Sequence, residues 1–394
     1  MRSLKKLLIL LGFLNAGIVY AQDSLLTNLA KQNLKTFEKT EKGFKGPGWD
    51  EILDKAKKSN YVAIGEDHFT NEIPYFFSAI IDQIKFDNFF CEIDPYSAQI
   101  IQDKINLLSP GDLRNYVNEF GNTFSFYAFQ AEFDLLKKLS KNHTKIQGTD
   151  QILLVADRLV CSELKKITKN EKARKIYETI EINSKTYFAN FLKNQAKGFY
   201  MYTPEFEKNL NELQVLALSK KEQQLISNLK LTAKIYKSQD HHLRVQLMKN
   251  QLMNNYSNWV NKKNLFKYGA NHMAKGESLL EIYDTGNLVN NIADSRFEKS
   301  VHIMVIGKSG FQASPFKGFD AEKVDENSGS LKTLKPFFKM VNGNAWHCFD
   351  LKSIQEAISD GKIKINDIKL LRIIKGFDMI VVIPSVTAST FIVD

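Results

Sequence analysis

Short apolar runs alternate with amphipathic segments in the first part of the chain. The run Tyr61–Gly65 is typical of a buried strand, and Asn71–Lys85 then repeats apolar residues at the three- and four-residue spacing of a helix. The same order recurs in the apolar run Asn88–Glu92 and the helical pattern from about Tyr96 to Leu108. Strands and helices that alternate in this way are typical of a parallel or mixed sheet covered on both faces.

The middle of the chain has a different pattern, which is almost wholly helical. A helix at Tyr127–Lys141 leads into a strand at Thr144–Gln147. From about Leu153 to Lys262 the helical periodicity is nearly continuous, with few glycines and with Pro204 as its one proline. This pattern indicates a helical insertion at about residues 153–262.

Strand signals return after the insertion, at Leu265–Gly269, Val301–Gly307 and Met379–Pro384. Both halves of the chain therefore supply strands to one sheet. We predict an α/β fold with a mixed, mostly parallel sheet flanked by helices, in a single domain over residues 22–394 that carries the helical insertion. The Lys- and Thr-rich segment up to about Pro47 is predicted to be a short helix followed by irregular chain.

The N-terminal segment is typical of a secretory signal peptide. It has a basic start, an apolar stretch and a small-residue cleavage signal, formed by Arg2, Lys5 and Lys6, by Leu7–Ile18, and by Val19-Tyr20-Ala21 before Gln22. The alternative, a core helix or a membrane anchor, is less consistent with so short an apolar run. We therefore expect residues 1–21 to be removed and the protein to be secreted or periplasmic. After cleavage we expect no stable membrane span.

Composition and charge exclude some classes of function. Apolar residues make up 43% of the chain and charged residues 25%, which is typical of a globular protein. The net charge is +10, but the lysines are scattered among acids and form no basic block with interleaved aromatic residues. Binding to nucleic acid is therefore not expected.

The three cysteines, Cys91, Cys161 and Cys348, are too few and too far apart for a disulfide framework or a CxxC metal site. Cys91 lies in an apolar run and is best interpreted as a buried thiol. A bridge between Cys161 and Cys348 is left open.

Acidic and histidine side chains follow four of the predicted strands at the points where the strands end. Because ligands bind beyond the carboxyl ends of parallel strands, such side chains are expected to converge on one cleft. A glycine precedes three of the clusters and allows a tight turn there. The clusters are Glu66, Asp67 and His68 after YVAIG, Glu92 and Asp94 after NFFC, Asp150 after KIQG, and His272 after FKYGA.

Each of these residues also has a purely structural interpretation. Glu66 and Asp67 would be favourable near a helix N-terminus, where acids cap the helix and complement its dipole. Asp94, before Pro95, is typical of a turn that begins a helix. His272 could be a hydrogen-bonded core histidine. The repetition of Gly-x-x-His at two strand ends favours the functional interpretation.

These motifs resemble a superfamily that groups erythromycin esterase-like, ChaN-like and Tiki/TraB proteins. The resemblance rests on Gly65–His68, on Gly269–His272 and on Glu92 at the end of the second strand. The motif IGEDHFTNE is similar to the GE-x-H opening of the ChaN and TraB branches. The helix YAFQAEFDLLKKL before Gly-Thr-Asp and the segment LRVQLMKNQL are similar to the erythromycin esterase-like branch, which implies a role for Arg244.

The residues and the resemblance together imply a hydrolase of ester or amide bonds. His68, oriented by Glu66 or Glu92, would act as a general base on water. His272 and Arg244 would stabilise the oxyanion or protonate the leaving group. Asp67, Asp94 and Asp150 would support the site.

Alternatively, His68, Glu92 and His272 could hold a divalent metal ion. The resemblance to Tiki-like metalloproteases implies such an ion, whereas the resemblance to erythromycin esterases implies metal-free chemistry.

Two other functions stay open at this point. The ChaN branch implies binding of haem or iron, with histidine as a ligand. A divergent site would instead imply a non-catalytic surface protein. If the protein is a hydrolase, its partner is a small-molecule or peptide substrate, and the helical insertion is expected to form a wall of the cleft.

Overall fold

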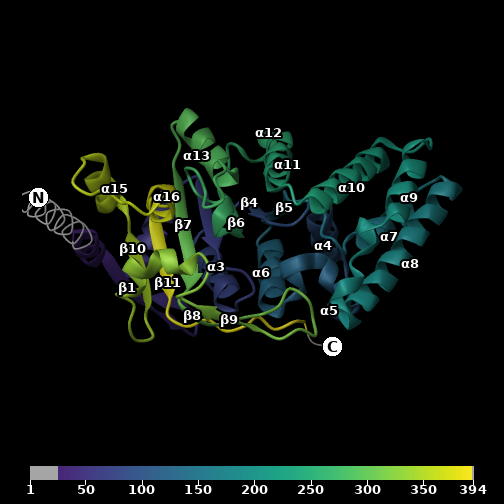
Figure 1. The fold of residues 1–394 in the computed structure, drawn as a ribbon. Helices are drawn as coiled ribbons and strands as arrows, with labels where there is room; N and C mark the ends of the chain where they lie inside the picture. The colour runs from purple at the N-terminus through teal and green to yellow at the C-terminus, as the bar shows by residue number, and fades with distance from the viewer. Residues whose placement is uncertain (1–24, 393–394) are drawn as a thin grey trace, which may run out of the picture. The chain divides into compact units, whose positions relative to one another are not determined.

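The structure of the protein, a computed structural model, describes residues 25–392 (Figure 1). The predicted signal peptide at residues 1–21 lies outside the described residues. The described chain forms two compact units, and the predicted single domain stays a prediction. Unit 1 contains residues 25–67, 268–311 and 323–387, and unit 2 contains residues 68–267, 312–322 and 388–392.

Nine strands of the described chain pair in a mixed, mostly parallel manner and are accompanied by helices, which confirms the predicted α/β fold. In unit 1 the strand order is β2-β1-β10-β11-β7-β3. The strands β11, β7 and β3 are parallel, whereas β2, β1 and β10 pair antiparallel. Their bounds are Leu34–Thr40 (β1), Gly43–Lys45 (β2), Tyr61–Glu66 (β3), Ser300–Gly307 (β7), Trp346–Asp350 (β10) and Met379–Ile383 (β11).

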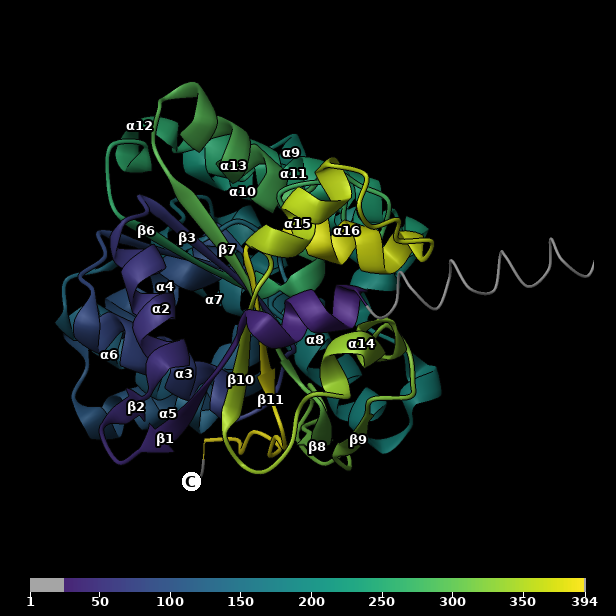
Figure 2. The ribbon, with the colours of Figure 1, turned by 90° about the vertical axis from the view of Figure 1, so that its left-hand side faces the viewer.

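The parallel strands of unit 1 are the ones that their apolar runs predict. All six residues of β3 and all five of β11 are buried, as expected for strands that are covered on both faces. Helices α2 (Pro47–Lys57) and α13 (Thr285–Ser295) pack against strands of this unit, and α15 (Lys352–Ser359) contacts α16 (Ile368–Gly376) beside β10 and β11 (Figure 2).

The prediction of irregular chain before Pro47 is wrong for Leu34–Thr40, because this segment forms strand β1. Only Phe37 of this strand is buried, so the strand has almost no apolar pattern of its own. The ring of Phe37 packs against Phe44, Trp49 and Trp346, at centroid distances of 5.3, 6.1 and 5.6 Å. Trp346 is distant in sequence, so packing that only the fold creates holds this strand in place.

In unit 2, β4 (Asn88–Cys91) pairs in parallel with β5 (Lys145–Gly148) and with β6 (Asn264–Gly269), whose last two residues belong to unit 1. Buried amides fix the register, since Asn88 bonds the side chains of Asn264 at 2.9 Å and Gln147 at 2.7 Å. The accompanying helices are α3 (Glu72–Gln83), α4 (Pro95–Leu107), α5 (Pro110–Phe120) and α6 (Gln130–Lys141), with the 3-10 segment η1 (Gly121–Ala128).

The predicted helical insertion is present in unit 2 (Figure 1). Its helices α7 to α10 enclose an apolar core of their own, built from residues between Ile152 and Ala233. A capping box formed by Ser219 and Glu222 begins α10. The helices are α7 (Asp157–Ile167), α8 (Glu171–Lys193), α9 (Pro204–Gln214), α10 (Lys220–Ser238), α11 (His241–Asn254) and α12 (Tyr256–Trp259).

Three further features of the described chain bear on the predictions. Strands β8 (Ser309–Gln312) and β9 (Glu322–Asp325) form a separate two-stranded sheet. None of the described helices is both long and apolar enough to cross a membrane. Cys91, Cys161 and Cys348 are buried free thiols.

Candidate functional site

A pocket of about 340 Å³ opens in unit 2 at the carboxyl ends of β4 and β5. Chain segments far apart in sequence line it, including the strand ends, η1 and helices α10 and α11 of the insertion. Its polar lining includes three carboxylates and one guanidinium, those of Glu92, Asp94, Asp150 and Arg244. Three rings also line it, those of Phe69, Phe126 and Tyr236.

The close approach of two strand ends forms one wall of the pocket. A Cβ atom at Gly148 would lie 2.4 Å from the carbonyl oxygens of both Ile93 and Asp94, so only glycine fits there. The amide of Asp150 donates to the carbonyl of Ile93 at 2.9 Å. These contacts hold the Glu92–Asp94 segment beside Asp150.

Arg244, from α11, joins two of the predicted site residues. Its Nη2 lies 2.7 Å from Glu92 Oε1 and 2.5 Å from Asp150 Oδ2, and its Nε donates to Asp150 Oδ1 at 2.9 Å. Burial lowers the pKa of Arg244, but Asp150 and Glu92 outweigh that effect and hold the pKa well above its usual value. The guanidinium is therefore a fixed positive charge that orients both carboxylates.

His68 contacts the other oxygen of Glu92. Its Nε2 lies 3.6 Å from Glu92 Oε2, and its ring is 4.6 Å from the ring of Phe126 at an interplanar angle of 35°. The His68 side chain is 27% exposed and the Glu92 side chain 7%, so the imidazole is accessible while the carboxylate is shielded. Unit 2 thus brings four predicted residues into one series, His68–Glu92–Arg244–Asp150.

Phe126, which the sequence did not indicate, lies between this series and a buried ion pair. The Nζ of Lys267 is 5.4 Å from the centroid of the Phe126 ring and 2.7 Å from Glu132 Oε1. The side chains of Lys267 and Glu132 are only 2% and 4% exposed. A buried pair of this kind is weak evidence for stability, because its desolvation offsets the attraction.

Two residues that line the pocket have strained backbones. Phe69 has a φ of 63°, and Ser125 has a φ of 54° with a ψ of −123°. A positive φ is unfavourable for residues other than glycine and clusters at functional sites. The carbonyl of Phe69 accepts hydrogen bonds from the amides of Ala313 at 3.0 Å and Ser389 at 2.9 Å, which hold it in place.

Asp94 has the capping role that its position before Pro95 suggests. Its Oδ1 accepts from the amides of Tyr96 at 3.0 Å and Ser97 at 2.8 Å at the start of α4. Burial raises the pKa of Asp94 to about 6. The structural interpretation therefore holds for this residue, although it also lines the pocket.

We expect the raised pKa of Asp94 to make stability depend on pH. Between pH 4 and 6 the folded protein binds more protons than the unfolded chain, so the free energy of unfolding should fall as pH rises through this window, by about 1–3 kcal/mol. Asp94→Asn keeps an acceptor for the helix cap and removes the charge, so it should flatten this slope. Urea unfolding of both proteins at pH 4, 5, 6 and 7 measures how the free energy of unfolding changes with pH.

Part of the slope should remain in that variant, because burial also raises the pKa of Asp157 to about 6. An unchanged slope in Asp94→Asn would show that Asp94 does not titrate in this window. A variant that loses stability at every pH would show instead that asparagine fails as a cap.

The other predicted residues belong to unit 1. Glu66 is the buried last residue of β3, and Asp67 Oδ2 accepts from the amide of Gly307 at the end of β7, at 3.2 Å. A Cβ atom at Gly65 would lie 2.8 Å from Cα of Ala270, so the end of β3 closely approaches the 3-10 turn η4 (Ala270–His272).

His272 is buried in that turn, and its Nδ1 lies 3.0 Å from Asp284 Oδ2. Asp284 also begins α13, since its Oδ1 accepts from the amide of Thr285 at 2.6 Å. Asp284 was missed in the sequence, where the start Asp-Thr-Gly of a helix would have been its one signal. The expected convergence of His272 with the unit 2 residues stays a prediction.

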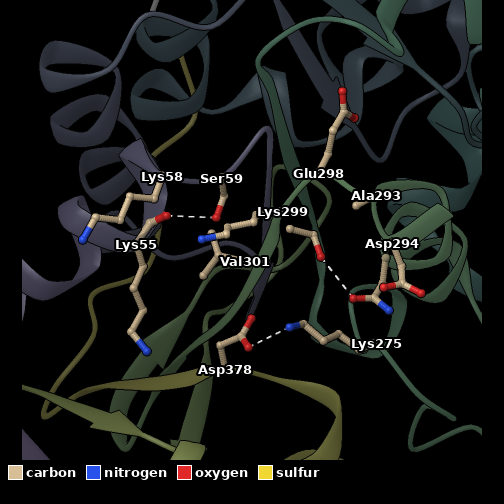
Figure 3. A pocket seen from close by; sticks show the side chains of 12 residues that line it. Lys55, Lys58, Ser59, Lys275, Ala293, Asp294, Glu298, Lys299, Val301 and Asp378 are labelled. Carbon is tan, nitrogen blue, oxygen red and sulfur yellow. Dashed lines mark hydrogen bonds and ion pairs between the residues drawn. The ribbon is translucent and has the colours of Figure 1, made fainter. Parts of the chain in front are cut away.

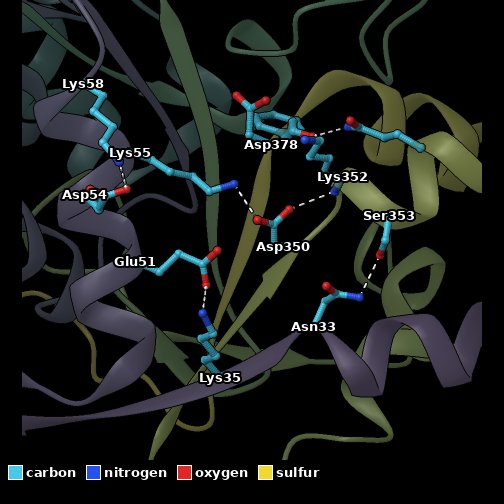
Figure 4. Close-up of polar contacts among 12 residues, drawn as sticks. Asn33, Lys35, Glu51, Asp54, Lys55, Lys58, Asp350, Lys352, Ser353 and Asp378 are labelled. Carbon is cyan, nitrogen blue, oxygen red and sulfur yellow. Dashed lines mark hydrogen bonds and ion pairs between the residues drawn. The ribbon is translucent and has the colours of Figure 1, made fainter.

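A second pocket, of about 380 Å³, lies in unit 1 near the amino ends of β3 and β7 (Figure 3). Its lysines are largely paired with acids, since Lys275 Nζ is 2.7 Å from Asp378 Oδ1 and Lys55 Nζ is 2.5 Å from Asp350 Oδ2. Figure 4 shows that Asp350 lies within a wider network of such contacts in this unit. Because ligands of parallel sheets bind at the carboxyl ends, the unit 2 pocket is the better candidate.

The unit 2 pocket fits metal-free chemistry better than a metal ion. Asp150 is bound by Arg244 and Asp94 caps α4, so Glu92 and the neighbouring His68 are left as ligands, fewer than the three that catalytic zinc sites use. The Arg244 guanidinium, 2.7 Å from Glu92, adds positive charge beside the carboxylate that would bind the cation.

No protein-family model and no curated protein sequence matches the chain. Solved structures do match. A succinoglycan biosynthesis protein aligns with a TM-score of 0.57 and 14% identity, over 94% of this chain and 99% of that one. A mutant of the erythromycin esterase EreC in its open conformation aligns with a TM-score of 0.58 and 14% identity, over 88% of this chain and 95% of that one. A protein from Bacillus cereus aligns with a TM-score of 0.57 and 12% identity, over 94% and 99%. The chain therefore has the fold of the erythromycin esterase-like proteins.

Proposed function

We propose that the protein is a secreted or periplasmic hydrolase that cleaves an ester or amide bond of a small molecule or peptide in the unit 2 pocket. The observation that carries this proposal is the series His68–Glu92–Arg244–Asp150 at the carboxyl ends of β4 and β5. The likeness in fold to an erythromycin esterase supports an ester as substrate.

His68 would act as the general base. Because Nε2 faces Glu92, the carboxylate favours the tautomer with its proton on Nε2 and leaves the lone pair on Nδ1. Nδ1 would then take a proton from the attacking hydroxyl group, and Glu92 would stabilise the imidazolium that forms. The gap of 3.6 Å between Nε2 and Glu92 is wider than a hydrogen bond, and such contacts tighten when substrate binds.

Arg244 would keep Glu92 in place and add positive charge where a tetrahedral oxyanion develops. Asp150 would anchor Arg244 through two hydrogen bonds. The His272–Asp284 pair of unit 1 is a second histidine oriented by a carboxylate and has the same capacity for proton transfer. Glu66 and Asp67 are not needed for these steps.

The proposal can be tested with a panel of nitrophenyl esters, lactones and peptides. Each substrate is incubated with protein that has been dialysed against a chelator. We expect cleavage of at least one ester at a rate that the chelator does not change. Loss of cleavage on dialysis, with recovery on adding Zn²⁺, would contradict the metal-free mechanism. Failure to cleave any member of the panel would count against the proposed hydrolase.

A further inference from the structure

Another pocket of unit 2, of about 880 Å³, lies along helix α6, and we call it the α6 pocket. Its lining residues on α6 recur at a spacing of three or four, so one face of the helix lines it. The end of α4, the start of α5 and the loop before β5 also line it. Because His143 of that loop lies two residues before β5, the α6 pocket is at the opposite end of this strand from Asp150.

The buried part of the α6 pocket is apolar. Leu113, Phe133 and Ile392 line it and are only 6%, 5% and 7% exposed. Ile105 and Leu108, at the end of α4, also line it and are half-buried. A concave site of this volume with an apolar lining is typical of pockets that bind small molecules.

The charged side chains that line the α6 pocket are all basic. Arg114 on α5 and Lys137 and Lys141 on α6 are exposed and carry three positive charges. Lys137 Nζ lies 2.6 Å from Asp134 Oδ1, but both side chains are about half exposed, so this pair is weak. Within residues 25–392, neither Arg114 nor Lys141 has an acidic partner. The pocket is therefore complementary in charge to an anion.

The apolar and basic groups lie at different positions along α6. Phe133 is in the first turn of the helix and Lys141 is its last residue, and between them the helix rises about 12 Å. Asn106 adds a donor at the basic end. Its Oδ1 accepts from Oγ of Ser140 at 2.6 Å, so its amide nitrogen is the atom that can donate to a ligand.

We propose that the α6 pocket binds a fatty acid of medium chain length. The carboxylate lies at the end of α6, where Lys141 and the amide of Asn106 donate to it, and Lys137 and Arg114 add positive charge. The aliphatic chain runs along α6 and covers the buried apolar residues, of which Phe133 is on the helix itself. This site is separate from the candidate active site, and the inference does not depend on the proposed hydrolase activity.

Isothermal titration calorimetry of the protein with hexanoate, octanoate and decanoate tests the inference. Each methylene group that leaves water should tighten binding by about fourfold. Acetate has the charge without the chain and decanol has the chain without the charge, so each should bind at least about tenfold more weakly than decanoate. An affinity that does not change with chain length, or decanol that binds as tightly as decanoate, would overturn the inference.

A double variant with Lys137→Gln and Lys141→Gln tests where the carboxylate binds. It should weaken decanoate binding by at least about tenfold and leave Tm nearly unchanged, because both side chains are exposed. Lys172 and Lys185, exposed on α8 in the same unit, provide the matched control. Lys172→Gln with Lys185→Gln removes the same net charge and should keep the wild-type affinity. Equal losses in the two double variants, or none in the first, would overturn the inference.

Two further titrations separate the α6 pocket from other sites and ligands. His68→Ala should bind decanoate as wild-type protein does, whether or not the protein is a hydrolase. A loss of binding in His68→Ala would place decanoate in the candidate active site and overturn the inference. Binding of decyl phosphate without binding of decanoate would also overturn it, since a phosphate and not a carboxylate would then be the head group of the ligand.

Discussion

His68→Ala is expected to lower kcat/KM for the best ester by about 10²- to 10⁴-fold, which is the usual contribution of a general base. His68 combines partial exposure with a contact to the Glu92–Arg244–Asp150 series. Because the His68 side chain is 27% exposed, its removal leaves no large cavity, and Tm should change little. Steady-state kinetics and a thermal melt on the same preparation measure both effects.

His242 is the matched control for this variant. It lies exposed on α11 in the same unit, two residues before Arg244. His242→Ala should leave kcat/KM within about twofold, since surface changes away from the site have small effects. Equal losses in the two variants, or full activity in His68→Ala, would remove the His68–Glu92 pair from the mechanism.

The sequence predicted the strands that are buried on both faces of the sheet. Strands β3, β7 and β11 are continuous apolar runs because both of their faces are buried. Strand β1 has no such pattern, since Phe37 alone is buried and its partner Trp346 is more than 300 residues away in the chain. Local periodicity cannot indicate a strand whose packing is made by such distant residues.

The sequence likewise predicted those site residues that the sheet topology positions, and missed those that only the packing of the folded chain brings to the pocket. Glu92 and Asp150 follow parallel strands, so the topology places them at one edge, and the glycine at position 148 marks their close approach. Arg244 came from resemblance and not from any pattern in its helix. Phe126 and Ser125 could not be found, because a tilted contact between two rings and a positive φ at a serine leave no mark in a sequence.

Arg244→Met is expected to destabilise the protein by about 3–5 kcal/mol, because it leaves two shielded carboxylates without their cation. The side chains of Glu92 and Asp150 are only 7% and 9% exposed, so water cannot replace the lost hydrogen bonds fully. Urea unfolding of Arg244→Met and of wild-type protein at pH 7 measures the difference in the free energy of unfolding.

Two comparisons separate the charge effect from lost packing. Arg174 is 44% exposed on α8 and pairs with Glu171 at 3.1 Å, so Arg174→Met should cost no more than about 1 kcal/mol. Adding Glu92→Gln and Asp150→Asn to Arg244→Met removes the unpaired charges and should restore most of the stability.

If the triple variant were as unstable as Arg244→Met alone, the packing of the arginine side chain, and not its charge, would hold α11 against the strand ends. A loss below about 1 kcal/mol in Arg244→Met would mean that the series His68–Glu92–Arg244–Asp150 contributes little to the fold, so its charges would be retained for chemistry alone.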